Sequence, residues 1–320
     1  MIFKREFGIM NKLKDLKYDI DSPVKVSVAM IAYNVEKYIE EAIESVLNQR
    51  VDFRVELVIG EDCSTDNTLL IALTYQEKYP DIIKVLRPER NQGLTPNCIA
   101  TINSCSGEYV ALLDSDDFWT NDNKLNLQID FLDKNETYAG SGHQSFKIYD
   151  DRPEINELFG ALESKDYVLN DMITHRKFHT SSFVFRKSIW DKTGGIPSDI
   201  SSNERALFPM VAIFGKIKYF KENMCVYRFS GFGLSSRIDY KELETDLNML
   251  PWLKDIDASF PTAKFKSFLH LCIYTYGVSK IPFSSLLKHY TLFVWNSFAY
   301  FPKNMGDLKW GTIDFVKRLI

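Results

Sequence analysis

Between residues 24 and 132 the sequence alternates four times between a short apolar segment and a segment with helical spacing. The apolar segments are unbroken rather than alternating with polar residues, which is typical of strands buried on both faces of a sheet. We therefore predict an α/β fold with a mostly parallel central sheet flanked by helices. The expected strands are 26–31, 53–59, 82–86 and 108–113, and the expected helices are 35–48, 66–78, 96–104 and 124–132.

Composition limits the class of protein. The 320 residues are enough for one large domain or for one domain with an appendage. A net charge of −4 argues against a nucleic-acid partner, and the five scattered cysteines argue against a disulfide framework or a zinc site. The N-terminus lacks the pattern of a signal peptide, and no apolar run reaches the length of about 18 residues needed to span a membrane. We expect a cytoplasmic protein.

Three of the expected strands end in polar residues. Tyr-Asn at 33–34 comes after the first strand, Glu-Asp at 61–62 after the second, and Asp-Ser-Asp-Asp at 114–117 after the fourth. Ligands of parallel sheets bind beyond the carboxyl ends of the strands. Three polar sets at one edge therefore predict a binding site.

The acidic tetrad 114–117 follows a strand that we expect to be buried. Mutual repulsion and lost hydration destabilise its three carboxylates unless a cation compensates for them. Mg²⁺ and Mn²⁺ bind such oxygens and commonly bridge to substrate phosphates. The alternative is a polar loop in which Asp117 or Asn121 caps the next helix.

The kind of ligand follows partly from what the sequence lacks. It has neither a glycine-rich dinucleotide motif nor a P-loop, so phosphates at this edge would be held by a metal ion. An Asp at the end of the second strand can accept a hydrogen bond from a nucleobase, and a Tyr at the end of the first can stack on its ring. These parts fit a nucleoside diphosphate whose charge rests on a cation.

A series of short motifs lies at 26–34, 45–49, 58–68, 91–93, 107–111, 114–116, 118–119 and 124–132. Together they resemble family 2 glycosyltransferases of the GT-A fold, of the bacterial polysaccharide or lipooligosaccharide type, over residues 24–235, with 114–116 as the D-x-D motif. The resemblance implies a metal-dependent, inverting hexosyltransferase. Its donor would be a nucleotide-diphosphate sugar, with UDP favoured and dTDP or GDP open, and its acceptor a hydroxyl of a glycan or lipid-linked glycan.

The same resemblance assigns roles on the donor side. Tyr33 and Asp62 would hold the nucleobase, Asp116 would bind Mn²⁺ or Mg²⁺ on the diphosphate, and Asp114 would lie by the ribose or behind the metal. Many relatives carry a basic residue after the Asn-x-Gly motif, and here Asn97 would supply a polar contact instead. The implied donor-binding set is Ala32, Tyr33, Glu61, Asp62, Asn97, Asp114, Ser115 and Asp116.

An inverting transfer needs a general base to deprotonate the acceptor hydroxyl. The family places an Asp or Glu for this purpose at a helix start after a glycine-rich loop. Glu204 follows Gly194-Gly195 in that context, where the family usually has Asp, and Asp199 is the next candidate. The alternative is that Glu204 is only a first-turn acid stabilised by the helix dipole.

Residues predicted on the acceptor side are Asp117, Trp119, His179 and Arg228. His179 precedes an expected strand at 183–186, and Arg228 ends a strand expected from Met224. Each residue has a structural alternative, because an aromatic also suits the core, a lone His is often structural and an Arg often forms a salt bridge. Ser230 stands where the family often has a metal-binding His, so we expect no metal contact there.

After Ser236 the resemblance ends and helices are expected at 239–256, 263–276, 284–298 and 307–320. From Lys264 onward eight basic residues face only two acids, among many aromatics. This composition suits a peripheral contact of residues 264–320 with the inner face of an anionic membrane. The alternatives are packing on the catalytic domain or on a second subunit.

The expected parts are an N-terminal extension (1–23), a GT-A catalytic domain (24–236, with a nucleotide-binding half at 24–120 and an acceptor half at 121–236) and a helical region (237–320).

Two other functions are considered. A phosphatase of the haloacid dehalogenase type needs Thr or Val where Phe118 stands. A nucleotide-sugar-binding module without catalysis would keep Tyr33, Asp62 and Asp116 but would need no base.

Overall fold

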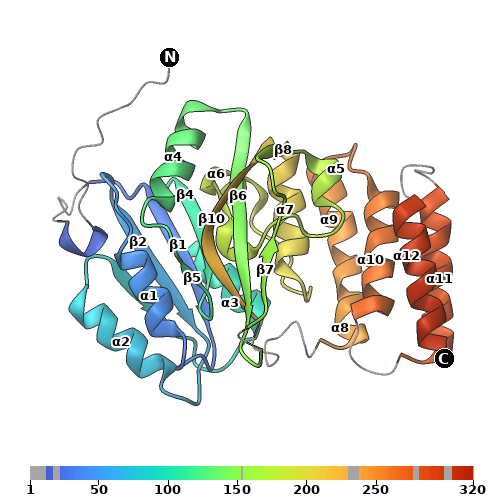
Figure 1. Cartoon of the computed structure of the whole chain (residues 1–320), viewed down its shortest axis with the longest axis horizontal. Helices are drawn as coiled ribbons and strands as arrows, with labels where there is room; N and C mark the ends of the chain where they lie inside the picture. Colours follow the sequence, from blue (N-terminus) through green and yellow to red (C-terminus); the bar gives the residue numbers. More distant parts are fainter. Residues whose placement is uncertain are drawn as a thin grey trace.

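A mixed sheet of ten strands forms the centre of the computed structural model, which describes residues 12–16, 22–152, 154–229, 238–276, 281–298 and 305–319 (Figure 1). The strands are β1 (Val26–Ala32), β2 (Val55–Glu61), β3 (Ile83–Leu86), β4 (Tyr109–Asp114), β5 (Phe118–Trp119), β6 (Tyr138–Tyr149), β7 (Asn156–Phe159), β8 (Lys165–Tyr167), β9 (Val184–Arg186) and β10 (Lys216–Phe229). They follow the order β3-β2-β1-β4-β9-β6-β10-β5, with β7 beside β6 and β8 beside β10.

Strands β1 to β4 form the predicted parallel half of the sheet. β1 pairs in parallel with β2 and β4, and β2 pairs in parallel with β3. Residues of both faces are buried in β1 and β4, as unbroken apolar segments require. The predicted α/β fold, with a central sheet flanked by helices, is confirmed.

The other half of the sheet contains β9, which the sequence analysis expected at 183–186, and further strands that it missed, β6 among them. β9 runs antiparallel to both β4 and β6, whereas β6 and β10 are parallel to each other. β6 contains Gly140 and Gly142, at which a Cβ atom would come within 2.7 Å of Val184 O and of the Phe178 ring. A larger side chain at either position would collide with these neighbouring groups, so the strand has glycines there. The glycines interrupt the apolar pattern that would mark a strand in the sequence. β10 begins at Lys216, well before the strand expected from Met224.

The helices are α1 (Ile39–Leu47), α2 (Thr68–Lys78), α3 (Leu94–Asn103), α4 (Lys124–Lys134), α5 (Leu169–Met172), α6 (Lys187–Thr193), α7 (Asn203–Ile213), α8 (Tyr240–Glu244), α9 (Met249–Ile256), α10 (Thr262–Tyr276), α11 (Phe283–Ser297) and α12 (Met305–Leu319), with 3₁₀ turns η1 (Leu13–Asp15), η2 (Thr180–Ser182) and η4 (Thr245–Asn248). The predicted helix at 239–256 is divided into α8, η4 and α9. Pro251 lies in the first turn of α9, where proline favours a new helix start.

Helix α1 begins four residues later than predicted. Asn34 has a left-handed φ of 53°, which ends the extended segment in a turn. The next amide, of Val35, donates to Thr68 Oγ1 at 2.8 Å and so joins this turn to the start of α2. The residues after β1 therefore form a fixed loop at the edge of the sheet rather than a first helical turn.

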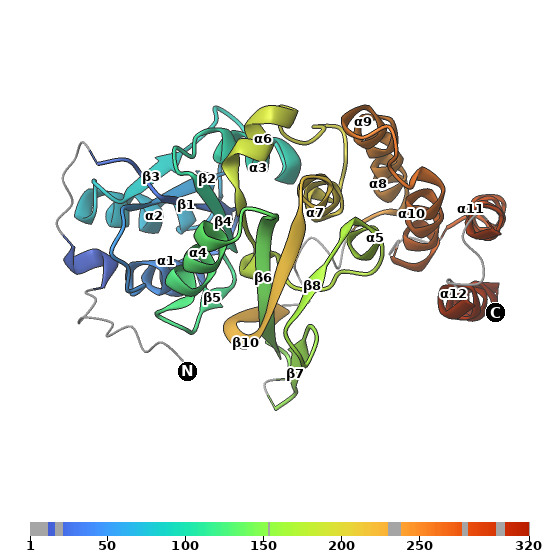
Figure 2. The same ribbon diagram turned by 90° about the horizontal axis from the view of Figure 1, so that it is seen from above.

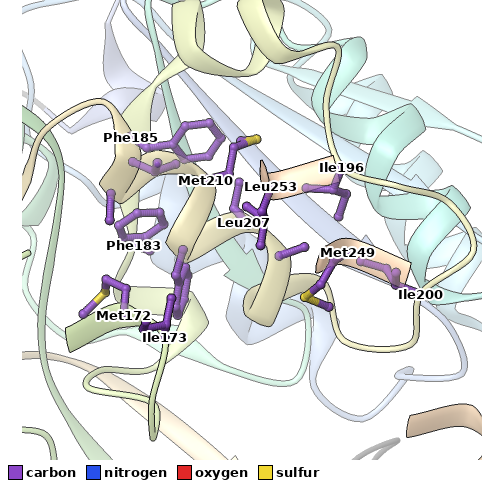
Figure 3. Packing of buried hydrophobic residues seen from close by; sticks show 14 of the residues in the cluster. Met172, Ile173, Phe183, Phe185, Ile196, Ile200, Leu207, Met210, Met249 and Leu253 are labelled. Atoms are coloured by element: carbon purple, nitrogen blue, oxygen red, sulfur yellow. The ribbon is translucent and has the colours of Figure 1, made fainter. Parts of the chain in front are cut away.

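Hydrophobic cores lie on both faces of the sheet. Leu207 and Met210 of α7 share one of them with Phe183, which precedes β9, and with Met249 and Leu253 of α9 (Figure 3). Helix α10 adds further side chains to this core. Helices α9 and α10 thus pack on the catalytic domain, which is one of the alternatives that the sequence analysis named for the C-terminal region.

Helices α11 and α12 lie beyond α10, at the end of the molecule farthest from β1 and β2 (Figure 2). In the described part of the chain no helix combines the length and the apolarity that a membrane span requires.

Lys124, the first residue of α4, is a buried cation. Its Nζ lies 4.0 Å from the centroid of the Trp119 ring and has no hydrogen-bond partner within the described residues. Burial lowers the pKa of Lys124 from 10.5 to about 7. Because the unfolded chain keeps this proton up to a higher pH, the lysine destabilises the folded state most at and below pH 7, and the penalty fades as the pH approaches 10.

Replacing Lys124 with Met should therefore raise the free energy of unfolding near pH 7. The advantage over wild type should shrink toward pH 10, by up to about 1.4 kcal/mol per pH unit, because the unfolded wild type alone still holds the lysine proton in this range. Urea denaturation of both proteins at several pH values measures the difference in their free energies of unfolding. Other titrating groups contribute equally to both proteins and cancel from this difference. Lys134→Met, at the exposed end of α4, is the control and should show no such trend. A pH-independent advantage for Lys124→Met would contradict the assignment.

Candidate active site

Parallel pairing places the predicted site residues at one edge of the sheet. Ile31 of β1 lies opposite Gly60 of β2 and Asp114 of β4. The residues that follow these three positions therefore leave the sheet together. Tyr33 is 47% exposed there, so its ring is available to a ligand.

Glu61 and Asp62 hold the loops at this edge. Glu61 is buried and accepts hydrogen bonds from the amides of Cys63 (3.2 Å) and Ser64 (2.6 Å), which closes the turn after β2. Asp62 is also buried, and its two carboxylate oxygens accept from the amides of Gln92 and Gly93, each at 2.8 Å. Glu61 thus fixes the turn after β2, and Asp62 fixes the loop that leads into α3.

Other members of the predicted donor set lie beneath the surface. The Ala32 side chain is buried, and its carbonyl accepts from the Asp62 amide at 3.0 Å. Asn97 is buried in α3 and donates through Nδ2 to the Gly60 carbonyl at 2.8 Å. A Cβ at Gly60 would come within 1.9 Å of Thr101 Oγ1, so this close packing of α3 on β2 depends on a glycine. Ala32 and Asn97 shape the loops around the edge.

The tetrad closes into a turn at the end of β4. The Asp117 amide donates to the Asp114 carbonyl at 3.0 Å, and Ser115 Oγ donates to the Ile31 carbonyl at 2.6 Å. The Asp117 carboxylate is buried and accepts from Ser181 Oγ at 2.5 Å and from the Arg228 amide at 2.8 Å. Asp114 and Asp116 are half-buried beside it.

Burial raises the pKa of all three carboxyl groups of the tetrad. The pKa of Asp114 rises to about 7, with the charges of Asp116 and Glu204 adding to the effect of burial. Burial raises the pKa of Asp116, against the opposing effect of Arg228. The pKa of Asp117 lies well above its usual value because of burial and the other two acids. A cation at this position would offset these costs.

His179 joins the tetrad from a segment far along the chain. Its Nδ1 lies 3.1 Å from Asp117 Oδ2, and its ring stacks on Tyr227 with centroids 3.8 Å apart. Burial lowers the pKa of His179 well below its usual value, which keeps the imidazole neutral. Asp114, Asp117 and His179 each offer one ligand atom, and these atoms lie within 4.8 Å of one another. Carboxylate oxygens with a neutral imidazole nitrogen form a donor set that suits Mn²⁺.

Arg228 supports the tetrad from the side of β10. Its guanidinium donates to the Asp116 carbonyl at 2.6 Å and to Glu41 Oε2 at 2.8 Å, and its Nε lies 3.6 Å from Asp150. The charge also lies 4.6 Å from the centroid of the Tyr38 ring. Sequence reasoning placed Arg228 near the acceptor but missed these partners, which lie on separate elements. Ser230 and residues 231–237 lie outside the described residues.

Trp119 occupies a core position, the alternative named for it in the sequence analysis. Its ring is buried against Lys124, and its Nε1 donates to the Ser181 carbonyl at 2.8 Å. Sequence reasoning considered Ser181 only as part of the segment that begins at His179. The structure shows that this one serine contacts Trp119, Asp114 and Asp117.

Glu204 lies in the first turn of α7, as predicted from the glycine-rich loop before it. It is half-buried, and its charge contributes to the raised pKa of Asp114. Asn203 beside it accepts from Thr95 Oγ1 at 2.7 Å, which ties α7 to α3. Asp199 is exposed and accepts from Asn248 Nδ2 at 2.9 Å.

Asp246 of η4 holds the start of α7, and the sequence analysis missed it. Its buried carboxylate accepts from the amides of Ser201 and Ser202, both at 3.0 Å, and from Arg205 Nη1 at 2.8 Å. No local motif signals this role, since Asp246 is more than 40 residues from its partners in a region without family resemblance. The helical C-terminal region therefore helps to position Glu204.

Comparison with known proteins identifies the family of this chain. The sequence model described as glycosyl transferase family 2 matches residues 27–194, which is more than half of the chain. The chain belongs to glycosyl transferase family 2. The resemblance carried by the sequence motifs is confirmed.

Curated relatives share part of their length with this chain. An uncharacterised protein of Mycobacterium tuberculosis is 30% identical over 209 residues, which cover 65% of this chain and 60% of that protein. An uncharacterised glycosyltransferase of Nostoc sp. is 29% identical over 216 residues, covering 65% and 66%. The minor teichoic acid biosynthesis protein GgaA of Bacillus subtilis is 26% identical over 178 residues, covering 51% and 40%. The chain thus spans less than two thirds of the length of each of these relatives.

Solved structures support the fold. TarS 1–349 of S. aureus in complex with UDP-GlcNAc has a TM-score of 0.61 at 21% identity, covering 93% of this chain and 82% of that one. The mannosyltransferase PcManGT of Pyrobaculum calidifontis, in complex with GDP-Man and Mn²⁺, has a TM-score of 0.53 at 17% identity, covering 95% and 90%. At these identities the likeness concerns the fold, and the expected GT-A arrangement is confirmed.

Asp246→Ala should destabilise the protein strongly, because it leaves the Arg205 guanidinium without its buried partner and two serine amides without an acceptor. Breaking a buried ion pair typically costs about 3–5 kcal/mol, and we expect a loss of that size in the free energy of unfolding measured by urea denaturation. Asp239→Ala is the control, since it removes the exposed N-cap of α8 and should cost about 1 kcal/mol. Equal losses in the two variants would refute the role of Asp246.

Proposed function

We propose that this chain is a metal-dependent, inverting glycosyltransferase that moves a hexose from a UDP-sugar to a hydroxyl of a glycan or lipid-linked glycan. The observation that carries the proposal is the buried turn after β4, which gathers three carboxyl groups with raised pKa values, together with exposed Tyr33 at the same edge. The neighbours TarS and PcManGT, solved with UDP-GlcNAc and with GDP-Man and Mn²⁺, support a nucleotide-sugar donor. GgaA, a minor teichoic acid biosynthesis protein, supports a role in polysaccharide biosynthesis.

On the donor side, Tyr33 stacks on the nucleobase and Asp62 accepts from it. Each oxygen of Asp62 already accepts one backbone N–H, which leaves each a further lone pair for a base N–H. Asp116 is the metal ligand carried by the family motif, and Asp114, Asp117 and His179 are further donors beside it. A bound Mn²⁺ or Mg²⁺ supplies positive charge to the leaving diphosphate.

On the acceptor side, Glu204 takes the proton from the attacking hydroxyl. It lies in the first turn of α7, and its charge acts on Asp114 of the tetrad that would hold the donor. Asp246 and Thr95 keep this helix start in place. We assign Arg228 to holding the tetrad, because its guanidinium donates to the Asp116 carbonyl and to Glu41.

A nucleotide-sugar-binding module without catalysis is the second candidate. It would use Tyr33, Asp62 and Asp116 in the same way, but it would give Glu204 no task. Family membership leaves no support for a phosphatase. The two remaining candidates differ in whether sugar is transferred, and substitution of Glu204 separates them.

Asp116→Asn should abolish metal-dependent binding of UDP, because an amide oxygen carries no charge to hold the divalent ion. Titration calorimetry of wild type with UDP should show affinity that depends on added Mn²⁺ or Mg²⁺, whereas the variant should show equal, weak binding with and without metal. Asp130→Asn, on the exposed side of α4, controls for the loss of an acid and should behave as wild type. Wild-type affinity that ignores the metal would sink this part of the proposal.

Glu204→Gln should slow transfer by about 10²–10⁴-fold, because the amide cannot accept the hydroxyl proton. Donor binding should be retained. Calorimetry with UDP should therefore give the wild-type affinity, whereas a transfer assay should show the loss of rate. Glu77→Gln, exposed on α2, is the matched control. A kcat near that of wild type in Glu204→Gln would move the role to another acid such as Asp199. NMR of the product should show an anomeric configuration opposite to that of the donor.

A further inference from the structure

The charge of the chain is divided unevenly along its length. Residues 258–320 contain eight Lys and Arg residues and two Asp residues, a net charge of +6. Because the whole chain carries −4, the first 257 residues carry −10. No Asp or Glu occurs between 258 and 306, a segment that includes all of α10 and α11. The C-terminal helices therefore form the basic end of an otherwise acidic protein.

Helix α11 presents an apolar face to solvent at this end. The residues on this face are Phe283, Leu287, Trp295 and Phe298, all exposed. At 3.6 residues per turn they fall within roughly a third of the helix circumference. Thr291 and Lys288, also exposed, occupy the same side, and Lys288 donates to Glu244 of α8 at 3.2 Å.

The opposite face of α11 is packed against the protein. Leu286, His289 and Phe293 are buried there, and Ser267 of α10 donates to the Phe293 carbonyl at 2.9 Å. Tyr290 stacks on Phe315 of α12 with centroids 4.0 Å apart. The exposed aromatic face is thus held rigidly outward, and Figure 2 places α11 and α12 at the tip of the molecule.

We propose that this outer face of α11 lies on an anionic membrane surface. Large apolar side chains on a helix without acids provide the buried area, and the surrounding lysines provide attraction to acidic lipids. A second copy of this chain could cover Trp295 and Phe283 only with its own α11 face, and that pairing would bring two basic ends of the protein together. A membrane supplies both the negative charge and the apolar layer. A surface-bound enzyme would meet a lipid-linked acceptor directly.

Vesicle flotation of the full-length protein tests this proposal. Wild type should float with vesicles of phosphatidylcholine containing about 30% phosphatidylglycerol at low salt and should stay behind with pure phosphatidylcholine. Raising the salt to about 0.5 M should release it, because screening weakens the lysine contribution. Failure to float on the anionic vesicles at low salt overturns the proposal.

The double variant Leu287→Gln/Trp295→Gln should reduce vesicle binding by on the order of tenfold or more, because it removes apolar area while glutamine preserves helix propensity. The two side chains are 42% and 76% exposed, so circular dichroism should show an unchanged fold. Leu70→Gln/Leu73→Gln on α2 is the matched control, with side chains 64% and 43% exposed, and should bind vesicles as wild type does.

Sedimentation velocity distinguishes the membrane from a second copy of the chain. Wild type without lipid should sediment as the double variant does. A wild-type dimer that becomes monomeric in Leu287→Gln/Trp295→Gln, or equal vesicle binding by both proteins, overturns the proposal. Transfer to a water-soluble acceptor should be unchanged in the double variant, so failure here would be distinguishable from failure of the proposed transferase activity.

Discussion

The buried carboxylate of Asp117 is the interaction on which the site depends. A carboxylate shielded from water needs good hydrogen-bond donors, because an unpaired buried charge is strongly destabilising. Ser181 and the Arg228 amide are those donors, from η2 beside β9 and from β10. One carboxylate therefore joins the end of the parallel half of the sheet to the later strands. The turn that carries Asp114 and Asp116 is fixed as a consequence.

Two arginines supply positive charge to this turn, since Arg176 opposes the raised pKa of Asp114 and Arg228 that of Asp116. The Arg228 guanidinium lowers the pKa of Asp116, yet it donates to the Asp116 carbonyl and to Glu41 and lies beside Asp150. Its charge is therefore shared among several acids. The carboxylates of the tetrad keep raised pKa values, which means that their ionised forms are held at a cost. A divalent cation that binds only the folded state would repay that cost and would couple donor binding to stability.

The sequence predicted those parts of the fold and site whose signals are local. β1 and β4 are unbroken apolar segments, and parallel pairing aligns the polar residues after them without further information. β6 was missed because Gly140 and Gly142 leave room for atoms of distant residues, so its pattern makes sense only in the folded protein. Asp246 was missed for the same reason, since its partners come from another part of the chain. Glu204 was found because a helix start after two glycines is a local signal.

The C-terminal helices contact the catalytic domain on their inner side and present an exposed surface on their outer side. On the inner side, Asp246 holds the start of α7, and α9 and α10 share its core, so removing the region would disturb Glu204 whatever its outer surface does. On the outer side, α11 is attached to α10 through Ser267 and Ser297, whose hydroxyls lie 2.7 Å apart, and to α8 through Glu244, which lies 3.2 Å from Lys288 Nζ and 2.8 Å from His289 Nε2. A truncation would remove the inner contacts and the outer surface together, so their effects could not be told apart. Substitutions on the outer face of α11 keep the inner contacts, and they isolate what that surface contributes.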